Sequence, residues 1–279
     1  MQSSLNIRNY YKPIQPTIIQ SAENVFYTEI FPDKKLLSFI YCYWQLKTKT
    51  QLTENYVYRV ISDGCIDVFF ELENPDESYL MGFCKNYTEF PLGKEFNYVG
   101  IRFLPSAFPL IFKQDAKELS NNDILLNLVS SDLATFIAHK FSNPKSLQQI
   151  KNELDTFFSK YLEKTDFSID NRFYKALEII LKSKGNARIV SDLDTGIIPR
   201  HLRRLFEFYI GDTAKTFSQV VRFQSFLNAK ISNQNTDNPS FYDMGYYDQS
   251  HFIKEFKTFC GVTPRNFITN FKIFIGYFC

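Results

Sequence analysis

The hydrophobic pattern of the first part of the chain is that of β-strands. Apolar residues there, many of them β-branched or aromatic, gather in short runs separated by turn-forming residues, as they do in strands. These runs cover 56–62, 65–72, 78–83 and 97–104. Asp63 and Gly64, between the first two runs, favour a tight turn. The spacing predicts an antiparallel, barrel-like sheet within a β-rich segment at 20–112.

After Pro105 the apolar residues recur three and four positions apart, which is the period of an amphipathic helix. Helices are predicted at 123–141 and 146–162, within a helical segment at 113–165, and Ser146 is suited to cap the second helix. The second helix carries one apolar stripe, formed by Leu147, Ile150, Leu154, Phe157, Phe158 and Leu162. The stripe is expected to face the core, and any part of it that is exposed would suit a dimer interface.

Every element predicted beyond residue 165 is helical, so we expect one domain at 1–165 and a second at 166–279. The helices are one marked by Phe173, Leu177, Ile180 and Leu181, and those at 190–196, 199–209, 216–231, 239–244 and 249–259. Twice, 50 residues apart, a short helix ends at a glycine before an amphipathic helix begins. The repeat predicts an α+β protein whose second domain has two helix–turn–helix units joined by a linker helix.

The helix predicted at 249–259 has two chemically different faces. Its inward face consists of Phe252, Ile253, Phe256 and Phe259, and its outward face of Gln249, Ser250, Lys254 and Lys257, with His251 on the flank. Asp248 is placed to cap the first turn. Glutamine reads adenine and lysine reads guanine or phosphate, so the outward face suits DNA. An ordinary solvated helix has the same pattern.

The helix predicted at 199–209 is similar but more basic. Pro199 stands at the first helical position, where its missing N–H costs nothing. Leu202, Leu205 and Phe206 point inward, whereas Arg200, Arg203 and Arg204 point outward with His201 beside them. Because the guanidinium fork matches both guanine and phosphate, this helix is predicted to contact DNA.

Charge is distributed unevenly along the chain. The net charge of the whole chain is +2, but residues 170–279 have 15 lysines and arginines and 10 acidic residues, a net of +5. Residues 1–169 have a net charge of −3. A basic second half indicates an anionic partner there, although a surplus of this size also fits a solvated surface.

Several classes of protein are disfavoured by composition. The N-terminus lacks the basic and apolar regions of an export signal, and no run of about 18 apolar residues predicts a membrane span. The five cysteines form no CxxC pair, which fits a reducing cytoplasm and neither a structural zinc site nor any other metal site. No cofactor motif is present.

An enzyme remains as an alternative, with Cys65 or Cys84 as nucleophile and a histidine as base. The chain has three histidines, two of them on the helices described above and the third, His139, in another helical segment. Because no catalytic spacing emerges, we expect a protein that is not an enzyme.

Three stretches of the second domain resemble the DNA-binding domain of AraC/XylS transcription regulators. GYYDQSHFIKEFKTFCGVTPRNF at 245–267 is similar to the signature of that family. RHLRRLFEFYIG at 200–211 and VVRFQSFL at 220–227 resemble its first helix–turn–helix unit and linker helix. In the first domain, ISDGCIDVFFEL at 61–72 and YVGIRFLPSAFPLIF at 98–112 resemble an uncharacterised N-terminal domain of one branch of the family.

The resemblance implies a seven-helix domain whose two recognition helices enter successive segments of the major groove. The positions that match base-facing residues are Arg200, Arg203 and Arg204 on the first helix, and Gln249, Ser250, His251 and Lys254 on the second; His201 lies beside the first set. It also implies a cytoplasmic, nucleoid-associated bacterial activator that binds promoter DNA and works with RNA polymerase. The first domain would sense a small-molecule effector or form a homodimer.

Two departures from the family pattern motivate an alternative, a degenerate regulator that acts through protein contacts with little DNA binding. Ile198 stands where the family has a capping serine or threonine, and Ser240-Phe241 stands where it has Ile-Ala. The effector is the least defined part of this functional interpretation. Trp44, Tyr58, Phe69 and Phe70 are candidates to line a pocket for a small hydrophobic molecule, and a filled core is the other interpretation.

Overall fold

The computed structural model describes residues 6–15, 24–143, 145–167, 170–232, 242 and 244–267. Its larger sheet has, in spatial order, β1 (Val25–Ile30), β2 (Ile40–Thr48), β7 (Asn97–Phe103), β4 (Ile66–Glu71), β5 (Asn74–Met81) and β8 (Asp123–Leu125). A second, two-stranded sheet pairs β3 (Val57–Val60) with β6 (Thr88–Pro91). Neighbouring strands are antiparallel throughout, which confirms the antiparallel prediction.

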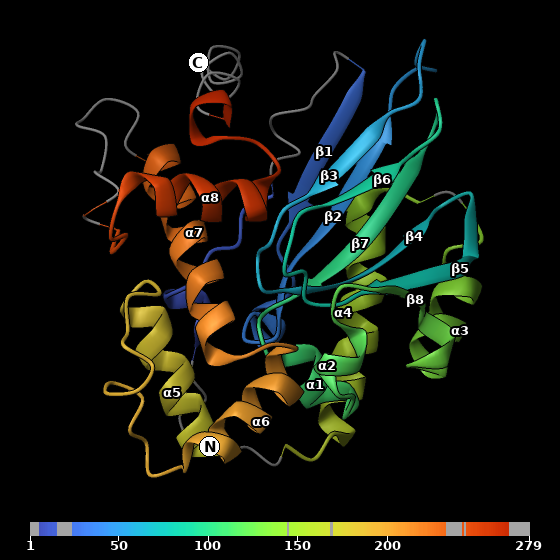
Figure 1. The fold of residues 1–279 in the computed structure, drawn as a ribbon. Helices are drawn as coiled ribbons and strands as arrows, with labels where there is room; N and C mark the ends of the chain where they lie inside the picture. Colours follow the sequence, from blue (N-terminus) through green and yellow to red (C-terminus); the bar gives the residue numbers. More distant parts are fainter. Residues whose placement is uncertain are drawn as a thin grey trace.

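Helices cover the larger sheet and form the second half of the chain (Figure 1). They are α1 (Ala107–Phe112), α2 (Ala116–Leu119), α3 (Ser131–Lys140), α4 (Leu147–Lys164), α5 (Asn171–Lys182), α6 (Pro199–Ile210), α7 (Ala214–Ser232) and α8 (Gln249–Cys260). Helix α4 packs on β1 and β2, and α3 packs on β5. The α+β class predicted from the sequence is therefore confirmed.

Alternation along the strands separates two buried layers. In β7, Val99, Ile101 and Phe103 point into the main hydrophobic core, under the helices. The Arg102 side chain points to the other face, toward the two-stranded sheet, and a side chain at Gly100 would point the same way. Because side chains alternate along a strand, the larger sheet has an apolar face against helices and a mixed face against β3 and β6.

The main core is continuous between the two halves of the chain. One buried cluster joins the helix-covered face of the sheet to apolar residues of α5, α6, α7 and α8. Gln224 of α7 is fully buried and ties the linker helix to two distant segments. Its amide donates to the carbonyl oxygens of Ser62 and Ile14 at 2.9 and 3.2 Å, and its oxygen accepts from the Ile14 N–H at 2.8 Å.

The strands on either side of Asp63-Gly64 do not pair with each other, although the sequence favours a tight turn there. Gly64 has φ +70, as such a turn requires, but β3 pairs with β6 while β4 pairs with β5 and β7. The turn therefore passes the chain from one sheet to the other. A side chain at Gly64 would also approach the Phe217 ring of α7 to 3.0 Å.

Two of the predicted helices are shorter than expected or missing. Within 123–141, Asp123–Leu125 is the edge strand β8, which pairs with Tyr79–Met81, and the helix begins only at Ser131. Residues 190–196 contain a turn and no helix; the Asp192 carboxylate accepts from the Arg188 N–H at 2.8 Å and the Asp192 N–H donates to the Arg188 carbonyl at 2.8 Å, so the two residues close a single local turn. The helix predicted at 239–244 lies largely outside the described residues.

The other helical predictions agree closely with the structure. Ser146 caps α4 in a capping box with Gln149, and the apolar stripe buries Ile150, Leu154 and Phe158. Helices α6, α7 and α8 match the predictions for 199–209, 216–231 and 249–259 to within two residues. The amphipathic period was thus a sufficient signal for these helices, together with a cap residue for α4 and α8 and Pro199 for α6.

Candidate nucleic-acid interface and ligand cavity

Helix α6 exposes the basic residues that the sequence assigns to it. Leu202 and Phe206 are buried, whereas Arg200, Arg203 and Arg204 are exposed and His201 is half-buried. Arg203 is already engaged, because its Nε lies 2.9 Å from Oε1 of Glu207 one turn on. Glu207 also contacts Lys117 of α2 at 3.0 Å, and these two donors, Arg203 first, lower the pKa of its carboxyl.

The first turn of α6 borders a hollow of about 360 Å³ on the surface. Four basic side chains line it: Arg172, Arg200, His201 and Arg204. Ile198 occupies the N-cap position and supplies no side-chain hydrogen bond, as the sequence indicated. The first-turn N–H groups of α6 therefore have no side-chain cap, and such groups are suited to an anion.

Helix α8 exposes Gln249, Ser250, His251 and Lys254 near its N-terminus. Asp248 caps the helix, since its carboxylate accepts from the His251 N–H at 2.7 Å. Phe252, Phe256 and Phe259 are buried.

The inward face of α8 differs from the prediction at one position. Ile253 is exposed, and the buried fourth member is Glu255 instead. Arg222 of α7 donates to the Glu255 carboxylate from Nη2 at 3.0 and 2.9 Å and from Nε at 3.4 Å, and Gln219 donates once at 2.9 Å. A buried carboxylate is tolerated because these donors satisfy it. The partner residues lie more than 30 positions away, so the helical period alone does not indicate this pair.

Helix α7 lies between the two candidate recognition helices (Figure 1). At one end Phe217 packs near Phe206 of α6, with ring centroids 6.4 Å apart. From the middle of α7, Phe223 packs on Phe256 of α8, with ring centroids 5.2 Å apart. The structure thus brings both predicted reading faces onto one helical framework through buried aromatic contacts.

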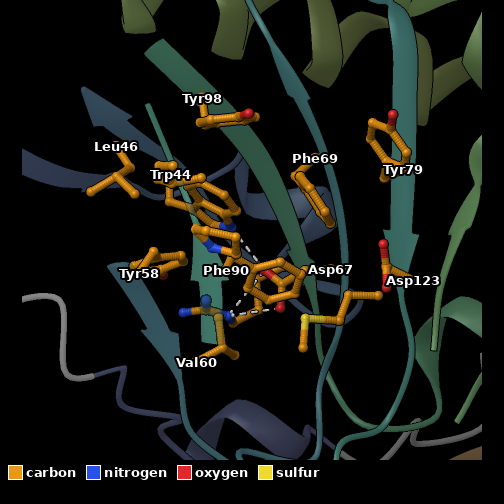
Figure 2. Close-up of a pocket in the computed structure, with 14 residues that line it drawn as sticks. Trp44, Leu46, Tyr58, Val60, Asp67, Phe69, Tyr79, Phe90, Tyr98 and Asp123 are labelled. Carbon is orange, nitrogen blue, oxygen red and sulfur yellow. Dashed lines mark hydrogen bonds and ion pairs between the residues drawn. The ribbon is translucent and has the colours of Figure 1, made fainter. Parts of the chain in front are cut away.

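A cavity of about 270 Å³ lies between the two sheets of the first half (Figure 2). Trp44, Tyr58 and Phe69 line it, as the sequence predicted. Phe70 does not, and that prediction was wrong: it points to the opposite face, is fully buried and stacks on Phe141 at 5.3 Å. Consecutive residues of a strand face opposite sides, so Phe69 and Phe70 cannot both line one cavity.

Sequence reasoning missed the polar floor of the cavity. Arg102 is buried beside three carboxylates, with its Nε 3.2 Å from Asp67 and 3.4 Å from Asp63, and its Nη1 3.4 Å from Glu29. Burial raises the pKa of Asp63 to about 6, although Arg102 opposes this. The alternation of β4 and β7 could have placed Asp67 and Arg102 beside Phe69.

The indole of Trp44 is fixed over β7 by two contacts. Its Nε1 donates to Asp67 at 2.7 Å. A side chain at Gly100 would come within 2.1 Å of the indole, so the ring occupies the space above that residue. Figure 2 shows the indole beside the cavity, with dashed lines from Asp67 to it.

Residues that flank the two-stranded sheet are hydrogen-bonded to α8. The Ser62 N–H, just after β3, donates to the Phe259 carbonyl at 3.2 Å. The Tyr87 N–H, just before β6, donates to the Thr258 carbonyl at 3.2 Å. The segments that flank β3 and β6, which supply one wall of the cavity, are therefore bonded to the C-terminal end of the second candidate recognition helix.

The four cysteines within the described residues have little nucleophilic character. Cys42, Cys65, Cys84 and Cys260 are free and buried, and burial raises the pKa of the Cys84 thiol to about 12 and that of Cys65 well above its usual range. No cluster suited to a metal ion occurs among the residues that the structure describes. Within the same residues, no helix combines the length and apolarity needed to cross a membrane.

Comparison with known proteins matches residues 28–125 to a family described as "Domain of unknown function (DUF6597)". No curated protein matches the chain. Apo ToxT from Vibrio cholerae with a lysine-to-alanine substitution is 14% identical, with 81% of this chain and 97% of that one covered, at a TM-score of 0.44. ToxT bound to (E)-4-(8-methylnaphthalen-1-yl)but-3-enoic acid is 15% identical, with 88% and 97% covered, at a TM-score of 0.42. Residues 28–125 thus match an uncharacterised N-terminal domain, as the sequence resemblance implied.

Proposed function

We propose that the chain is a sequence-specific DNA-binding transcription regulator whose helices α6 and α8 read successive segments of the major groove. One observation carries the proposal. Both helices bury an aromatic side against α7 and expose a polar N-terminal half, which is mainly basic on α6. Two such helices joined by a linker helix suit a double helix–turn–helix reader, in which the N-terminal residues of each recognition helix reach base edges.

Each exposed residue has a defined use in this reading. Arg200 and Arg204 border the basic hollow and are placed for guanine or phosphate. The guanidinium of Arg203 is hydrogen-bonded to Glu207, so we assign Arg203 a smaller contribution to DNA binding. On α8, Gln249 is suited to adenine, while Ser250, His251 and Lys254 complete the face.

The first half, at 1–165, acts in this proposal as the sensor or dimerisation domain, and 166–279 as the DNA-binding domain. A sensing role is supported by the cavity and by the hydrogen bonds from Ser62 and Tyr87 to α8. The sequence resemblance adds activation through RNA polymerase, a homodimer, and a cytoplasmic, nucleoid-associated location as further parts of the proposal.

The proposal is tested by selecting DNA from a random-sequence pool with the full chain, followed by binding titrations on the selected site. Arg204→Ala and Gln249→Ala should each weaken specific binding by about 1–3 kcal/mol for a lost bidentate contact. Lys35→Ala removes one exposed charge from the first half, and Gln148→Ala one exposed amide, so both should bind like the parent. If both interface variants bound like the parent, the assignment of α6 and α8 as recognition helices would be refuted.

A degenerate regulator with little DNA binding remains the second candidate, because Ile198 leaves α6 without a side-chain cap. Phe241, the other departure, lies outside the described residues. The same selection separates the two functions. Enrichment of one sequence, with affinity that falls steeply as salt rises, excludes the degenerate form.

A further inference from the structure

The cavity between the sheets has the lining of an aromatic cage. Six rings contribute to its wall: Trp44, Tyr58, Phe69, Tyr79, Phe90 and Tyr98. They come from six strands, four of the larger sheet and both of the smaller one, and Figure 2 shows them around one space. Aromatic faces carry partial negative charge, so a cage of this kind attracts a cation more strongly than a neutral group of equal size.

The charged residues of the wall favour the same kind of ligand. Asp67 and Asp123 line the cavity, and Arg102 is the cation among the lining residues. Arg102 is only 2% exposed and already faces Asp63, Asp67 and Glu29. Its charge is therefore neutralised by its own neighbours, and the surplus in and around the cavity is negative.

An anionic ligand would meet an unfavourable environment here. To bind Arg102 it would have to displace a carboxylate that the protein itself supplies, and the remaining carboxylates would repel it. An ammonium group loses hydration on entry but finds both carboxylates and ring faces in return. The exposed Asp123, on the edge strand β8, lies where such a group would enter or rest.

We propose that this cavity binds a small organic cation, a protonated amine or quaternary ammonium compound carrying an apolar group. A volume of about 270 Å³ limits the ligand; at the density of protein interiors this is about a dozen non-hydrogen atoms. The inference deepens the proposed function and rests on it in one respect, the assignment of the cavity as the effector site.

Trp44 provides a direct assay, since it is the single tryptophan of the chain and forms part of the wall. Benzylammonium, benzyl alcohol and benzoate have nearly the same size and shape but differ in charge. Each is titrated into the full chain, without DNA, while Trp44 emission is recorded. Benzylammonium should change the emission in a saturable way at the lowest concentration, benzyl alcohol should bind more weakly, and benzoate should not bind.

Asp123→Asn tests the charge argument at an exposed residue whose replacement leaves the core intact. It should weaken benzylammonium binding about fivefold and leave benzyl alcohol unchanged. Asp76→Asn makes the same change at an exposed position of β5 that does not line the cavity, and should bind like the parent.

Three results would overturn the proposal: benzoate binding as tightly as benzylammonium, equal effects of the two asparagine variants, or no emission change with any probe up to millimolar concentration. None of these outcomes involves DNA. The DNA selection with Arg204→Ala and Gln249→Ala is read independently, so failure of the cation site and failure of the regulator assignment are distinguishable.

Discussion

Replacing Gln224 with alanine should destabilise the whole protein, because this side chain connects both halves of the chain. It is fully buried in α7 and makes three hydrogen bonds, two with Ile14 and one with Ser62. Truncation leaves one backbone N–H and two carbonyl groups without these partners. An orphaned buried polar group costs about 1–3 kcal/mol, and water entering the space offsets part of the sum, so we expect a loss of about 3 kcal/mol.

Urea unfolding followed by circular dichroism measures this loss. Gln224→Glu is a second variant of nearly the same shape, which places a carboxylate oxygen against two carbonyls and should lose at least as much. Gln148→Ala is the matched control, because Gln148 is exposed on α4 and its amide bonds only to Asn152 at 3.1 Å. The control should lose at most about 0.5 kcal/mol.

The same experiment examines the continuity of the core. Because one buried cluster joins the sheet to α5, α6, α7 and α8, parent unfolding should follow a single transition. If Gln224→Ala unfolded within about 0.5 kcal/mol of Gln148→Ala, or the parent showed two separate transitions, the connecting role of this residue would be refuted.

Two further predictions concern the cavity floor. Gly100→Ala should force the indole of Trp44 off β7, because the added carbon would lie 2.1 Å from it; we expect a red-shifted emission and a loss of about 1–3 kcal/mol, and parent-like emission and stability would contradict the packing. For Asp63, burial raises the folded-state pKa to about 6, above the ordinary value of 3.8, so its stabilising contribution is present at low pH and lost as pH rises through about 6. The free energy of unfolding of Asp63→Asn, relative to that of the parent, should therefore rise by roughly 2–3 kcal/mol between about pH 4 and pH 7, as measured by urea unfolding at both pH values. A relative free energy that falls as pH rises would contradict the raised pKa of Asp63.

The sequence predicted helices better than sheet connections, for a physical reason. The helical period and cap residues are local, so Ser146, Pro199 and Asp248 mark helix starts within a few residues. Strand pairing is not local. Asp63-Gly64 looks like a hairpin turn, yet its neighbours belong to different sheets, because β3 finds its partner only at Thr88–Pro91.

The candidate sites show the same difference between local and non-local signals. The exposed faces of α6 and α8 that we propose to read DNA follow from the helical period, apart from Ile253 and Glu255, whose positions depend on Arg222 of another helix. The cavity lining depends on which strand faces align across the sheets. Three of the four residues expected to line a pocket do line this cavity, and strand alternation alone would have removed Phe70.

The buried Arg102 cluster explains why this cavity has polar residues in an aromatic wall. A guanidinium with three carboxylates is costly to bury unless each charge is paired, and here every carboxylate also has another donor or some contact with solvent. Asp67 accepts from the Trp44 indole, Asp63 accepts from Gln15 at 2.7 Å, and Glu29 is partly exposed. The cluster therefore holds the indole in place while keeping its positive charge away from a ligand. Replacing Arg102 would expose carboxylates that now neutralise it, so the aromatic cage and the acidic floor depend on the same side chain.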